Sequence, residues 1–159
     1  MLSRGLFFAR VKAFQLGDPW EGAMGELDAA ELRQATIYSQ DNGEELWRAA
    51  VDDHANSLNS FGISCWDRSE CESAAFWKIY VPLGLGVAIQ STVGRVQKVT
   101  ATRNVIARAI DYRGHRNRHL GRDPLELLTT KRHDFQHEAE IRFLFHSLKM
   151  NSLDSKCGA

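Results

Sequence analysis

The stretch "HEAEIRFLFHS" at residues 137–147 alternates charged and apolar side chains. Successive side chains of a β-strand point to opposite faces, so this pattern predicts a strand over residues 138–146. One face carries Glu138, Glu140 and Arg142, and the other carries apolar groups such as Ile141 and Phe143. Two interpretations of the charged face remain open: the solvated side of an edge strand, or the floor of a site.

Working outward from this strand, hydrophobic periodicity predicts further elements in both halves of the chain. Strands and helices follow one another without regular alternation, which favours an α+β class over a doubly wound sheet. We expect a mixed, mostly antiparallel sheet with flanking helices. Strands are expected near residues 5–10, 60–66, 86–91, 105–112 and 138–146, and helices near 28–39, 43–58, 70–81 and 123–131.

The helix expected at 70–81 has a start signal and an apolar stripe. Ser69 and Glu72 stand three residues apart, the spacing of a capping box. Phe76, Ile79 and Tyr80 then recur at helical spacing and are predicted to pack on one face of the sheet. The "GVAIQS" run after this helix is predicted to be a buried strand.

Composition indicates one ordinary globular domain. The chain has 159 residues, of which 43% are hydrophobic and 25% charged, with no formal net charge. We expect a single domain over residues 1–148 and a frayed tail over 149–159. Charge neutrality disfavours a broad nucleic-acid footprint, and no apolar run reaches transmembrane length. The partners left open by these features are proteins or small molecules.

Cysteine and histidine spacings indicate no metal site. The three cysteines are odd in number and unpaired in spacing, which predicts reduced thiols in the cytoplasm. His133 and His137 are four residues apart, as are His115 and His119. The first pair lies where helix gives way to strand and the second in an arginine-rich loop, so we interpret both as surface histidines.

The "GDPWEG" segment at residues 17–22 is the other concentration of polar chemistry. Asp18 before a proline is a common turn initiator, which makes a capped turn anchored by Trp20 one interpretation. The alternative is a rim loop in which Asp18 and Glu21 hold a ligand or a facing arginine. In the helix "AFWKIY", the aromatic residues Trp77 and Tyr80 are typical of core packing.

Three segments, taken in order, resemble a known family. These are "LFFARVKAFQLGDPWEG", "GISCWDRSECESAAFWKIYVPLGLGVAIQS", and "AIDYRG" followed by "KRHDFQHEAEIRF". They resemble the Asp-Pro-Phe-Glu-Gly opening, the Cys-Trp strand with its aromatic helix, and the E-x-E-x-R strand of the bacterial domain-of-unknown-function family 2971. The resemblance covers roughly residues 6–145. Members of that family are mostly bacterial or phage-borne cytoplasmic proteins, some of them near defence genes.

That family is distantly similar to ADP-ribosyltransferases, which place a (Q/E)-x-E motif on a late strand. The resemblance therefore implies Glu140 and Glu138 as catalytic residues and NAD as the substrate, with cleavage of the nicotinamide–ribose bond. It also implies that the polar and aromatic residues of the three segments converge on one cleft. The ligand-binding residues implied in this way are Asp18, Glu21, Trp77, Tyr80, Lys131 and Arg142.

Two departures from the family pattern favour a competing interpretation. Gly17 stands where the family has Asn, and the chain starts almost at the "LFFAR" segment that the family places several dozen residues later. If the family's chemistry requires an early-strand ligand-binding residue, that residue is missing here, and either the start codon is wrongly placed or the protein is a trimmed version. Under this alternative the protein is a non-catalytic binding or interaction module of the same fold, in which Glu138, Glu140 and Arg142 form an ion-pair network.

Overall fold

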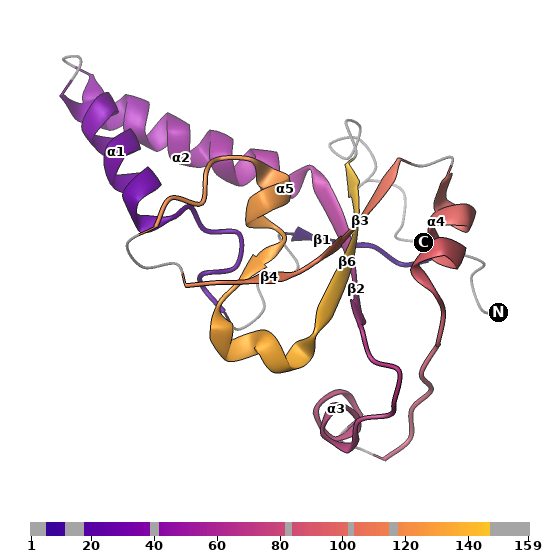
Figure 1. Cartoon of the computed structure of the whole chain (residues 1–159). Helices are drawn as coiled ribbons and strands as arrows, with labels where there is room; N and C mark the ends of the chain where they lie inside the picture. The colour runs from indigo at the N-terminus through magenta and orange to yellow at the C-terminus, as the bar shows by residue number, and fades with distance from the viewer. Residues whose placement is uncertain are drawn as a thin grey trace.

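A computed structural model describes residues 6–11, 18–38, 42–81, 84–101, 104–114 and 118–146 (Figure 1). The predicted tail lies outside these residues. The elements in chain order are β1 Ala9–Arg10, α1 Glu26–Ile37, α2 Gly43–Asn59, β2 Phe61–Asp67, α3 Ala74–Tyr80, α4 Val93–Thr100, β3 Val105–Ala109, β4 Asp111–Tyr112, α5 Pro124–Leu127, β5 Thr130–Lys131, the 3-10 helix η3 His133–Glu138 and β6 Glu140–His146.

The main sheet has the strand order β1-β2-β6-β3, and all its neighbours are antiparallel. A separate parallel pair joins β4 to β5. This confirms the predicted α+β class with a mixed, mostly antiparallel arrangement. The strand that decided the prediction, β6, is central rather than at an edge. The interpretation of Glu140 and Arg142 as the wet side of an edge strand is therefore wrong.

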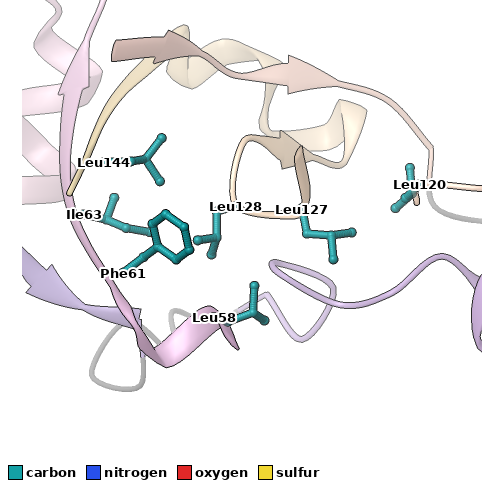
Figure 2. Close-up of a cluster of buried hydrophobic side chains, with 7 residues drawn as sticks. All are labelled: Leu58, Phe61, Ile63, Leu120, Leu127, Leu128 and Leu144. Carbon is teal, nitrogen blue, oxygen red and sulfur yellow. The ribbon is translucent and has the colours of Figure 1, made fainter. Parts of the chain in front are cut away.

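The hydrophobic core lies on one face of this sheet. Phe61 and Ile63 of β2 and Leu144 of β6 point from the strands toward Leu127 and Leu128 at α5 (Figure 2). Leu144 is fully buried and Ile63 is 2% exposed. Figure 1 shows the α1–α2 pair and α5 on the same side of the sheet, with α4 on the other side. The core therefore fills the space between the sheet and α5.

An aspartate in α1 fixes the loop that enters α5. The Asp28 carboxylate accepts hydrogen bonds from the backbone amides of Leu120 at 2.6 Å and Gly121 at 3.1 Å, and its other oxygen lies 3.0 Å from His119 Nδ1. Gly25 passes so close to this loop that a Cβ there would lie 2.6 Å from a backbone oxygen. These contacts hold α1 against the segment that leads to the core leucines.

Residues 86–91, predicted to be a buried strand, are neither paired nor buried. The segment has no assigned helix or strand and is solvent-exposed, with exposed fractions of 92% at Val87 and 78% at Ile89. The prediction was wrong because apolar, β-branched residues favour a strand conformation but do not supply a neighbouring strand to pair with.

No helix in the described part of the chain combines the length and apolar character needed to cross a bilayer.

Helix α3 also departs from its prediction. It does not cover a sheet face, since Ile79 is 60% and Tyr80 62% exposed, and Figure 1 shows it set apart from the sheet. Its apolar side chains instead contact each other, with the Phe76 and Tyr80 rings 4.7 Å apart. The N-cap is Ser73, whose hydroxyl accepts from the amide of Phe76, rather than the predicted Ser69–Glu72 box.

Candidate functional site

The charged residues of β6 continue the same face that carries the core. Side chains two residues apart on a strand share a face, so Leu144, Arg142 and Glu140 all point toward α5 and β5. The core leucine thus gives way to an arginine that is fully buried and a glutamate that is 7% exposed. A buried charge requires a partner, and the surrounding elements supply several.

Arg142 uses its whole guanidinium group. Its Nε lies 2.7 Å from Glu140 Oε1 and its Nη2 lies 3.2 Å from Glu140 Oε2, a two-point contact between neighbours on the strand. Nη2 also donates to Glu21 in the "GDPWEG" segment, and Nη1 donates to the Leu128 carbonyl at 2.6 Å. The last contact satisfies a carbonyl at the end of α5. Arg142 therefore ties β6 to two segments distant in sequence.

Lys131 of β5 approaches from the other side. Its Nζ lies 2.5 Å from Glu138 Oε2 and 2.7 Å from Glu140 Oε2. Although burial acts in the opposite direction, these two hydrogen bonds raise the pKa of Lys131, so the ammonium stays charged. Tyr112, beside Lys131 in the parallel pair, accepts a hydrogen bond from the Glu140 amide at 2.7 Å.

The alternation predicted for a strand stops at Ala139, yet Glu138 still contacts Lys131. Glu138 ends the 3-10 helix η3 instead of starting the strand, and Ala139 adopts a left-handed backbone with φ of 41°. This turn lets the Glu138 side chain reach Lys131 while remaining 21% exposed. We call Glu21, Lys131, Glu138, Glu140 and Arg142 the buried network.

The two buried carboxylates respond differently to this setting. Burial acts to raise the pKa of Glu140, but the hydrogen bond and charge of Arg142 outweigh it and lower the pKa. For Glu21, burial outweighs the attraction of Arg142 and Lys131, and its pKa is raised. Glu140 is therefore the firmly ionised member and Glu21 the member that protonates more easily.

The remaining predicted site residues lie around the network to different degrees. The Asp18 carboxylate pairs with Arg132, with Oδ2 3.2 Å from Nε and Oδ1 3.1 Å from Nη2, one residue from Lys131. Burial of the Tyr80 hydroxyl and the charge of Glu138 raise the pKa of Tyr80, so this hydroxyl lies within electrostatic range of the network. Trp77 makes no side-chain hydrogen bond or ion pair with the network among the residues that the structure describes.

Cys65 is a neighbour that sequence reasoning left without a role. It pairs across the strands with Arg142 and its thiol hydrogen-bonds Glu140. Although the residue as a whole is exposed, desolvation of the sulfur raises the pKa of the thiol, which stays protonated and is a poor nucleophile. No local signal in the sequence could have found it, because the register that places Cys65 opposite Arg142 is a long-range property of the sheet.

The described residues contain no cluster of three or more His, Cys, Asp or Glu side chains arranged to hold a metal ion. No protein-family model matches the chain, and comparisons with curated proteins and with solved structures give no match. The resemblance to family 2971 therefore stays a prediction. The features that bear on function are the chemistry of the buried network and the exposed surfaces.

Proposed function

We propose that the protein is a non-catalytic interaction module whose buried network holds the fold together. The observation that carries this proposal is that both oxygens of Glu140 are occupied, Oε1 by Arg142 and Oε2 by Lys131 and Arg142. A carboxylate that stabilises a developing positive charge needs a free oxygen directed at the substrate. Glu140 would have to break an ion pair first.

The partner surface in this proposal is the exposed apolar part of the chain between β2 and α4. Leu85, Val87 and Ile89 lie in an exposed segment that pairs with no strand of the described part of the chain, and Ile79 and Tyr80 of α3 precede it. Exposed apolar surface of this kind marks interaction sites, and a segment outside the sheet offers its backbone for pairing with a partner strand. A protein partner is the class that fits both features.

The alternative, an NAD-cleaving enzyme of the ADP-ribosyltransferase type, is favoured by one observation at Glu138. Its Oε1 takes part in no hydrogen bond with any residue that the structure describes, and the side chain is 21% exposed. Loss of nicotinamide leaves an oxocarbenium-like ribose, which carboxylates stabilise. In this alternative Glu138 faces the substrate and Glu140 acts by holding Lys131 and Arg142.

One experiment separates the two. Purified protein is incubated with NAD and nicotinamide release is followed, beside Glu140→Gln and Glu138→Gln variants. The interaction module predicts no release above buffer from any of the three, together with a lower unfolding midpoint for Glu140→Gln. Release by the wild type that Glu138→Gln abolishes, at unchanged stability, would overturn the proposal and establish the enzyme.

A further inference from the structure

A cavity lies on the face of the sheet opposite the buried network. Its volume is about 440 Å³, within the ~300–1,000 Å³ range of small-molecule sites. Ile141 and Phe143 of β6 form its floor, since they alternate with the network residues. Trp66 of β2 forms one wall, with its ring edge-on to Phe143 at 6.0 Å, and Val96 of α4 closes the other.

An arginine stands at the mouth of this cavity. The strand pattern continues one residue past β2, because the Arg68 amide still donates to the Ala139 carbonyl at 3.0 Å. Arg68 therefore shares the face of Trp66, two residues earlier, and both line the cavity. The Arg68 guanidinium makes no ion pair with any residue in the described ranges, so it is available to a ligand.

An acidic group accompanies this arginine. Glu70 also lines the cavity, and its side chain is not paired with another described residue. Asp67 lies opposite Glu140, so strand alternation directs its side chain to the network face instead. The cavity thus offers one guanidinium and one carboxylate beside an apolar interior. This pair complements a head group that carries an ammonium next to a carboxylate.

We propose that this cavity binds an apolar α-amino acid. The side chain packs between Trp66 and Phe143, the carboxylate pairs with Arg68, and the ammonium faces Glu70. The contact to Arg68 is charge-assisted and can be bidentate, which fixes the orientation of the head group. The site is distinct from the buried network, because it uses the other sheet face.

The probe is the indole N–H of Trp66, which donates to Ser64 Oγ at 3.1 Å. Its resonance in a ¹⁵N-labelled sample is assigned with a Trp66→Phe variant and followed while L-phenylalanine is added up to ~10 mM, an upper bound for a weak site. We expect a saturable shift with phenylalanine and leucine and none with glycine. Phenethylamine lacks the carboxylate, so its affinity should be lower than that of phenylalanine by about tenfold or more.

Two variants on the same face complete the test. Arg68→Gln should weaken phenylalanine binding about tenfold, because it removes a charge-assisted contact. Arg95→Gln, an exposed position of α4 outside the cavity lining, should leave it unchanged. A Trp66 resonance that does not shift with any amino acid overturns the proposal, as does equal affinity in wild type and Arg68→Gln.

Discussion

Replacing Arg142 by methionine should destabilise the protein strongly and in a pH-dependent way. The variant leaves the Glu140 and Glu21 carboxylates buried without their shared guanidinium and leaves the Leu128 carbonyl without its donor. Breaking a buried ion pair by removing one partner costs about 3–5 kcal/mol. Domains are stable by only ~5–15 kcal/mol, so a large fraction of the folding free energy is at risk.

The pH dependence follows from the directions of the two carboxylate pKa values. In the wild type the pKa of Glu140 is lowered, so its stabilisation is present above the unfolded value and is lost as the pH falls through the folded value. Without Arg142 the desolvation of both carboxylates dominates and their pKa values rise. The variant should therefore recover stability as the pH falls from about 7 to about 5.

Urea unfolding followed by circular dichroism at both pH values measures this effect. The matched control is Arg108→Met, because Arg108 lies directly opposite Arg142 on β3 but is exposed. Its effect should stay within ~0.5 kcal/mol. A loss below ~1 kcal/mol for Arg142→Met, or an equal loss at both pH values, would refute the reasoning that the network is a buried, ionised cluster.

Three further predictions concern other parts of the fold. Gly25→Ala should destabilise by clashing with backbone, whereas Gly94→Ala, with open space at its Cβ, should stabilise α4 by about 0.5–1 kcal/mol in thermal unfolding. The hydrogen bond to Asp28 raises the pKa of His119, so the stabilisation from this pair is present below the ordinary histidine pKa and is lost as the pH rises through the raised pKa. Asp28→Asn should return the pKa of His119, measured by NMR, toward about 6.5. Val87→Lys should leave the unfolding midpoint unchanged and raise solubility, because that side chain is almost fully exposed; a lowered midpoint would show that it is packed.

Much of the fold could be predicted because its signals are local. The alternation of β6 and the helical periodicity of α1 and α2 each follow from neighbouring residues, and all three elements form. Whether Glu140 and Arg142 face solvent depends on which segments cover that face of β6, a long-range property that alternation does not contain. The strand predicted around Val87 does not form for the same reason, since a strand needs a neighbouring strand to pair with.

The family resemblance implied more about the members of the site than about its chemistry. Three segments that resemble family 2971 implied that Glu21, Lys131, Glu138, Glu140 and Arg142 lie together, and hydrogen bonds and ion pairs join these five. Trp77 was implied with them, but no hydrogen bond or ion pair joins it to them among the described residues. Which oxygens remain free is set by side-chain positions at the scale of a single ångström. The left-handed turn at Ala139, for example, leaves no mark in a strand-like pattern.

The span of the buried network has a kinetic consequence. Glu21 and Arg142 are 121 positions apart, so their contact closes a long loop and becomes favourable only after intervening chain has been ordered. Contacts formed after the transition state leave the folding rate unchanged and slow unfolding. The network should therefore determine how long the native state persists before it opens, and Arg142→Met should shorten that lifetime while folding proceeds at nearly the wild-type rate.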